Sequence, residues 1–107
     1  MKQAQQAKCR KIAEKYGMRN QEQQSVSELT ELMYLLTRRP AQLGEAFKEE
    51  HGKSWREGLL NEIADVYIML EQLLTLHGIN KIEVDEEIEY KLNRQLDRIK
   101  IEQEAKP

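Results

Sequence analysis

The 107-residue sequence predicts an all-α protein, a compact antiparallel bundle of four main helices in a single domain over residues 1–107. Glu, Gln, Lys and Leu, which favour helices, are abundant, whereas the chain has only 5 Gly and 2 Pro to interrupt them. Apolar residues recur at steps of three and four over long stretches, which is the spacing of a helix face. Short connections between these stretches make neighbouring helices antiparallel.

The first helix is expected from about Lys2 to Tyr16. It ends at Gly17, because glycine readily adopts the left-handed conformation that closes helices. Its apolar residues are few and mostly small, so residues 1–18 are expected to form a peripheral helix that leans on the bundle.

The second helix is expected to begin near Asn20, a plausible N-cap, and to stop at Arg38 or Arg39 before Pro40. Its apolar residues recur at helical spacing: Val26, Leu29, Leu32, Met33 and Leu36. This periodicity predicts one face that packs in the core.

Residues 40–58 are expected to form a connection, with a short helix around 45–51. The third helix begins at Ser54 or Leu59 and ends at His77, before Gly78. Apolar residues cover nearly its whole circumference, which predicts a place at the centre of the bundle.

The fourth helix is expected over about residues 84–103, with apolar residues on one side and charges elsewhere. The last residues, 102–107, are expected to fray.

Charge and hydropathy narrow the class of protein. The net charge is −2 and no block of like charge occurs, so a nucleic-acid partner is not expected. No apolar run approaches the roughly 20 residues that cross a bilayer, so no membrane partner is expected. The single cysteine, Cys9, and an N-terminus without an apolar signal segment favour the cytoplasm.

Two acidic pairs are the most informative feature. Glu28 and Glu31 lie three residues apart in "SELTEL", and Glu62 and Asp65 lie three apart in the apolar stretch "LLNEIADVYIML". This spacing puts both members of a pair on one helix face. If the second and third helices pack side by side, four carboxylates converge, and a hard divalent cation would offset their repulsion. Oxygen ligands alone indicate Mg²⁺, with Mn²⁺ as a substitute.

Other interpretations of the pairs stay open. Glu28 and Glu31 also fit an ordinary solvated face, and Glu62 and Asp65 fit the polar edge of a central helix. A di-iron site is not expected because no Glu-x-x-His motif occurs, and zinc is disfavoured by the lack of clustered His and Cys.

Both acidic pairs and their surroundings resemble the MazG-like all-α nucleoside triphosphate pyrophosphohydrolases, especially the short forms of phages and Gram-positive bacteria. The similar phrases are "KIAEKYGMRNQ", "EIADVYIMLEQL" and "EYKLNRQLDRI", which together span about residues 5–100. The interval between the pairs, residues 32–61, is longer than is usual in that family.

The resemblance implies that the protein hydrolyses a nucleoside triphosphate to the monophosphate and pyrophosphate, and that the substrate is a deoxy- or non-standard nucleotide. The carboxylates Glu28, Glu31, Glu62 and Asp65 would hold Mg²⁺, and Glu28 or Glu31 would serve as the catalytic base. The family also assembles into homodimers or homotetramers, so a second copy of the chain is an expected partner.

Candidate substrate contacts lie on two other segments. Lys91 and Arg94 would bind phosphate, although a salt-bridged helix surface explains them equally well. Asn20, Gln21 and Gln24 would bind the base or sugar, although Asn20 also fits a helix cap.

Aromatic residues complete the candidates. Trp55 is suited either to stack on a base or to seal a core, and Tyr34 and Tyr67 are expected in the core.

Two further hypotheses remain at this stage. One is a related pyrophosphohydrolase that acts on phosphoribosyl-ATP. The other is a non-catalytic helical interaction module, which would have no need of a complete acidic quartet.

Overall fold

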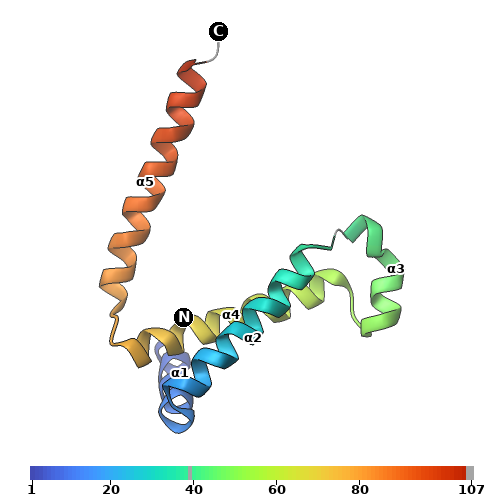
Figure 1. The fold of residues 1–107 in the computed structure, drawn as a ribbon, viewed down its shortest axis with the longest axis horizontal. Coiled ribbons are helices and arrows are strands. Elements are labelled where there is room, and N and C mark those ends of the chain that lie inside the picture. Colours follow the sequence, from blue (N-terminus) through green and yellow to red (C-terminus); the bar gives the residue numbers. More distant parts are fainter. Residues whose placement is uncertain (39, 106–107) are drawn as a thin grey trace. The chain divides into compact units, whose positions relative to one another are not determined.

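The computed structural model describes residues 1–38 and 40–105, with the side chains of residues 40–43 left out. These residues form five helices and no strand (Figure 1). The helices are α1 (Gln3–Tyr16), α2 (Met18–Leu36), α3 (Pro40–His51), α4 (Trp55–His77) and α5 (Lys81–Ala105). The all-α prediction is therefore confirmed: the four main helices are present, and α3 covers the short helix expected in the connection. The chain divides into two units, Met1–His77 and Gly78–Pro107.

Gly17 both ends α1 and begins α2. Its φ of 83° lies in the region that favours glycine, and its N–H donates to the Ala13 carbonyl at 2.9 Å. The predicted end of the first helix is confirmed. The prediction that Asn20 is an N-cap is wrong, because α2 begins at Met18 and Asn20 lies inside its first turn. A glycine that can turn the chain abruptly lets the second helix start at once.

The region between α2 and α4 is more helical than the sequence indicates. Instead of a short helix at 45–51, α3 runs over Pro40–His51, with a kink at Gly44 (φ 35°, ψ −127°). Proline is favoured in the first turn of a helix, which lets α3 begin there. Ser54 Oγ accepts a hydrogen bond from the Glu57 N–H at 3.1 Å, so α4 begins immediately after Ser54, as expected.

Helices α2 and α4 lie side by side and antiparallel (Figure 1). Gln21 hydrogen-bonds Gln72 near one end of the pair, and Leu35 lies beside Gly58 near the other. The two contacts are fourteen residues apart on each helix, and the residue numbers rise along α2 while they fall along α4.

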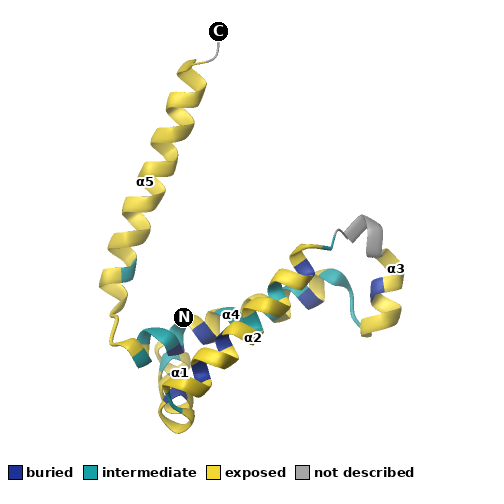
Figure 2. Ribbon diagram, in the orientation of Figure 1, coloured by how far each residue is buried: buried dark blue, intermediate teal, exposed yellow. Residues whose placement is uncertain are grey.

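The seam between these two helices follows the heptad spacing of a coiled coil. A set of buried and half-buried positions on each helix recurs at alternating steps of four and three (Figure 2). They are Gln21, Ser25, Glu28, Leu32 and Leu35 on α2, and Gly58, Glu62, Asp65, Met69 and Gln72 on α4. Polar residues therefore hold most of the positions that a coiled coil usually fills with apolar ones.

The apolar face predicted for α2 is not its packed face within the single chain. Val26, Leu29, Met33 and Leu36 are exposed, and only Leu32 of the predicted set is half-buried. Helix α4 contacts α1, α2 and α3, yet it also exposes an apolar stripe: Leu60, Ile63, Tyr67 and Leu70.

The core of the described chain is correspondingly thin. Its buried apolar residues are Cys9, Ala13, Leu35, Phe47 and Met69. The prediction that Tyr34 and Tyr67 belong to this core is wrong, because they are 42% and 64% exposed.

Helix α5 begins earlier than predicted because of a capping box. The Glu83 N–H donates to Asn80 Oδ1 at 2.9 Å, and the Asn80 N–H donates to Glu83 Oε2 at 2.9 Å. The helix continues to Ala105, past the expected onset of fraying, whereas residues 106–107 lie outside the described chain. Within the described residues, none of the helices is both long and apolar enough to cross a bilayer.

Candidate metal centre

The antiparallel seam brings the two acidic pairs together. Glu28 and Glu31 lie one turn apart on α2, and Glu62 and Asp65 lie one turn apart on α4. Glu28 interacts with Asp65, and Glu31 with Glu62. Because the helices run in opposite directions, the first member of one pair meets the second member of the other.

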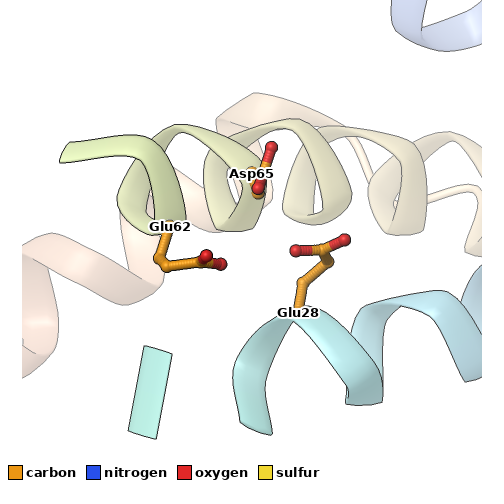
Figure 3. A group of neighbouring side chains, drawn as sticks. All are labelled: Glu28, Glu62 and Asp65. Carbon is orange, nitrogen blue, oxygen red and sulfur yellow. The ribbon is translucent and has the colours of Figure 1, made fainter. Parts of the chain in front are cut away.

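Three of these carboxylates converge. One oxygen each from Glu28, Glu62 and Asp65 lies within 4.8 Å of the other two (Figure 3). Within the described residues, this is the only group of three or more His, Cys, Asp or Glu side chains at such range. All three residues are half-buried, whereas Glu31 is exposed and lies beside Glu62 but outside the group.

Two oxygens in the group lack a partner. Glu28 Oε2 and Glu62 Oε2 are buried and accept no hydrogen bond within the described chain. The other oxygen of Glu28 accepts from the Gln24 amide at 2.9 Å, which orients that carboxylate. A buried oxygen without a partner costs about 1–3 kcal/mol. A cation on these oxygens would remove that cost, and an all-oxygen set suits Mg²⁺ or Mn²⁺.

The local field also favours a cation. Burial raises the pKa of the Glu62 carboxyl above its ordinary value, and the nearby Glu31 and Asp65 carboxylates raise it further. Burial likewise raises the pKa of Asp65, and Glu28 adds to the effect. Lys53 opposes this rise at Asp65 but does not cancel it. The site therefore carries more negative charge than its protein surroundings stabilise.

Lys53 is a site residue that sequence reasoning missed. It lies in the turn between α3 and α4, twelve positions from Asp65, so neither helical spacing nor a motif connects the two. Only the fold of that turn brings its ammonium near the carboxylates.

The predicted base-binding residues gather around one pocket. Asn20, Gln21 and Gln24 line a cavity of about 270 Å³ together with Ile12 and Tyr16. Two of the three amides are engaged inside the chain: Gln21 Nε2 donates to Gln72 at 2.5 Å, and Gln24 Nε2 donates to Glu28. Their role toward a base stays a prediction.

The predicted phosphate ligands lie on the other unit. Lys91 and Arg94 are exposed on α5, and the Arg94 guanidinium lies 5.6 Å from the centre of the Tyr90 ring. Their role toward phosphate also stays a prediction.

Trp55 has a structural contact. Its indole Nε1–H donates to the Leu35 carbonyl at 3.0 Å, and the same carbonyl accepts the Arg38 N–H at 3.1 Å at the end of α2. Of the two roles considered for Trp55, this contact supports the one that seals the junction of α2 and α4.

The comparisons with known proteins give no relative. A scan of family models finds no match for the chain, and neither curated proteins nor solved structures contain a similar one. Functional reasoning therefore depends on the chain's own residues and geometry.

Proposed function

We propose that the protein hydrolyses nucleoside triphosphates, including deoxy- or non-standard nucleotides, to the monophosphate and pyrophosphate with the aid of Mg²⁺. One observation carries the proposal: Glu28, Glu62 and Asp65 converge from two helices, and two of their buried oxygens have no hydrogen-bond partner among the described residues. The sequence resemblance described above suggests the reaction, and the open carboxylate cluster supports it.

In this proposal the residues divide into two roles. Glu28, Glu62 and Asp65 hold the cation, and Glu31 lies at the exposed side of this set. When bound, Mg²⁺ would neutralise charge on the triphosphate and acidify water. Glu31 takes the proton of the attacking water, because it is exposed and adjacent to Glu62 without belonging to the convergent group. The water oxygen bonds to the α-phosphorus, the bond from that phosphorus to the α–β bridging oxygen breaks, and pyrophosphate leaves.

Lys53 is the cation within the same unit that is suited to the phosphates. Its ammonium already interacts with Asp65, so it lies where a triphosphate held by these carboxylates would carry negative charge.

The proposed assembly is a homodimer or homotetramer. The apolar stripes of α2 and α4 are exposed in the single chain, and such contiguous stripes mark interaction surfaces. Light scattering at micromolar concentration should show more than one chain per particle. Leu60→Glu should reduce the mass to that of a monomer, while Glu57→Gln on the same helix should not. A wild-type protein that is monomeric throughout would contradict this assembly.

Pyrophosphate release tests the reaction. Purified protein is incubated with standard, deoxy- and damaged triphosphates, first with Mg²⁺ and then with EDTA. We expect release that EDTA abolishes and that Glu62→Gln lowers by at least about 100-fold, the usual scale for losing an electrostatic contact to the transition state. Glu57→Gln, an exposed carboxylate on the same helix, is the matched control and should keep full activity.

The same assay separates the alternatives. Release from phosphoribosyl-ATP alone would identify that compound as the substrate. No release from any substrate, with normal folding and Mg²⁺ present, would refute the enzyme and favour a non-catalytic interaction module.

A further inference from the structure

A second cavity adjoins the carboxylate cluster on the side opposite Gln21 and Gln24. It measures about 360 Å³ and is larger than the pocket around Tyr16. Glu31 and Glu62 belong to its wall, so the cavity opens directly onto the candidate metal centre. Its other lining residues are Thr30, Tyr34, Leu35, Phe47, His51, Lys53 and Gly58.

Three flat rings line this cavity. Phe47 is 3% exposed, and its ring centre lies 4.2 Å from that of His51, which fixes the two rings against each other. Tyr34 contributes the third ring. The Arg38 guanidinium lies 4.1 Å from the centre of the Tyr34 ring, and Arg38 does not line the cavity. Arg38 therefore steadies the Tyr34 ring from outside, and the cavity is formed before any ligand enters.

Gly58 lines the cavity and leaves part of it unfilled. Gly58 has no side chain there, and a β-carbon at this position would lie 3.6 Å from Phe47 Cζ and 3.7 Å from Leu35 Cδ1. The glycine thus keeps open a volume that a larger residue would fill. A preformed cavity of this size, mostly apolar and with charged groups at one end, is typical of small-molecule sites.

The polar groups lie where phosphates rather than a base would need them. Glu31, Glu62 and Lys53 are the charged residues of the lining, and they adjoin the proposed cation and triphosphate. The Thr30 hydroxyl already donates to the Val26 carbonyl at 2.7 Å, so its proton is not available to a ligand. The ring-lined part offers stacking surface, and its side-chain hydrogen-bonding groups are the Tyr34 hydroxyl and the His51 ring nitrogens, of which Nε2 lies 3.7 Å from Glu50 Oε2.

We propose that this cavity binds the nucleobase of the triphosphate by stacking against Tyr34 and His51, with the buried Phe47 packed against His51, and that it accepts bases with little regard to their hydrogen-bonding edges. Every base has a π-face, so stacking sites tolerate different bases. Strong discrimination would require polar groups that pair with one base and are left unpaired by another. The proposal rests on the proposed function and deepens it, because it assigns the base to this cavity rather than to the one near Asn20.

Binding of α,β-methylene analogues of ATP, GTP, CTP and UTP, which resist cleavage, tests the assignment by calorimetry in Mg²⁺. We expect the four dissociation constants to fall within about tenfold of one another. Tyr34→Leu removes a ring from an exposed position and should weaken all four by about 5- to 150-fold, the range for losing one stacked base. Inorganic tripolyphosphate, which has no base, should bind Tyr34→Leu as tightly as it binds the wild type.

Tyr16→Leu is the matched control, since Tyr16 is exposed and lines the competing pocket with Asn20 and Gln24. It should leave all dissociation constants unchanged. Loss of analogue affinity in Tyr16→Leu but not in Tyr34→Leu would overturn the proposal in favour of that pocket. A single analogue that binds more than 100-fold tighter than the rest would overturn the claim of base tolerance.

Pyrophosphate release by the same wild-type preparation tests the proposed reaction separately from the proposed base-binding cavity. Release with normal Tyr34→Leu affinities would refute the base assignment and leave the reaction standing. Analogue binding that depends on Tyr34, without release from any triphosphate, would refute the reaction and support the cavity. Absence of both binding and release would refute both.

Discussion

Neutralising Glu62 should stabilise the metal-free protein while it removes the response to Mg²⁺. Glu62→Gln keeps the size of the side chain and deletes one charge from a cluster whose oxygens lie within 4.8 Å of one another. Two unit charges at that distance repel by about 0.9 kcal/mol in water and by about 3.5 kcal/mol at an effective dielectric constant of 20. Because the site is only half-buried, the lower figure applies.

Glu31 and Asp65 both act on Glu62, so the deletion removes at least two repulsions and should raise the free energy of unfolding by about 1–2 kcal/mol. For a chain of this length that corresponds to an increase of roughly 4–15 °C in melting temperature.

Thermal unfolding followed by circular dichroism, in EDTA and then in Mg²⁺, measures both effects. The wild type should gain stability with Mg²⁺, by about 2.7 kcal/mol at a hundredfold excess over the dissociation constant. Glu62→Gln should melt higher than the wild type in EDTA and gain little from Mg²⁺. The control Glu57→Gln should follow the wild type. A variant that melts below the wild type in EDTA, or a wild type unaffected by Mg²⁺, would refute the electrostatic reasoning.

Three further outcomes follow from the same geometry. In EDTA, the free energy of unfolding should rise as the pH falls from about 7 toward 4.5, because the raised folded-state pKa values of Glu62 and Asp65 make the native state bind protons more readily than the unfolded chain does. Saturating Mg²⁺ should reverse that slope. A free energy of unfolding that does not change with pH in EDTA would contradict the prediction. Gly58→Ala should raise the melting temperature by about 3–6 °C, because glycine inside a helix costs about 0.5–1 kcal/mol relative to alanine. The new methyl group would meet Phe47 and Leu35 at ordinary contact distance. An unchanged or lower melting temperature would contradict the prediction. Lys53→Met should raise KM for the triphosphate about tenfold with little change in kcat, since a phosphate contact present in both ground and transition states mainly affects binding. An unchanged KM in steady-state kinetics would show that Lys53 does not contact the substrate.

Local signals in the sequence were sufficient for most helix boundaries. Gly17 and Gly78 end helices where expected, and Ser54 marks the start of α4. The errors occur where two signals compete. Asn20 has the side chain of an N-cap, but Gly17 already turns the chain and makes that cap unnecessary. The capping box of Asn80 and Glu83 could have placed the start of α5 correctly, since both residues stand at the required spacing.

The carboxylates of the candidate site were predictable, whereas its cavity was not. The i, i+3 spacing predicts that each acidic pair shares a face, and antiparallel packing then brings Glu28 near Asp65. Phe47, His51 and Lys53 come from α3 and the turn after it. Their positions depend on how α3 folds back against α4, and no periodicity in the sequence encodes that.

The face of α2 that packs on α4 is the most instructive difference. Apolar periodicity indicated the stripe with Val26 and Leu29 as the packed face, yet the structure packs the stripe with Gln21, Ser25 and Glu28. Periodicity identifies which residues avoid water, but it does not say which partner covers them. Within one chain, the polar stripe pairs with α4, and the apolar stripe stays exposed, where the proposed assembly would cover it.

Placing carboxylates at heptad seam positions weakens the pairing of α2 with α4, because apolar residues there would bury surface without any electrostatic cost. The hydrogen bond between Gln21 and Gln72 one heptad away fixes the register, so that Glu28 meets Asp65 rather than a neighbour one turn away. A seam built only for stability would need neither feature. Within the described residues, a fixed register thus surrounds acidic oxygens that accept no hydrogen bond, which is the arrangement that the proposed cation requires. Its positive charge would restore the stability that the carboxylates take from the seam.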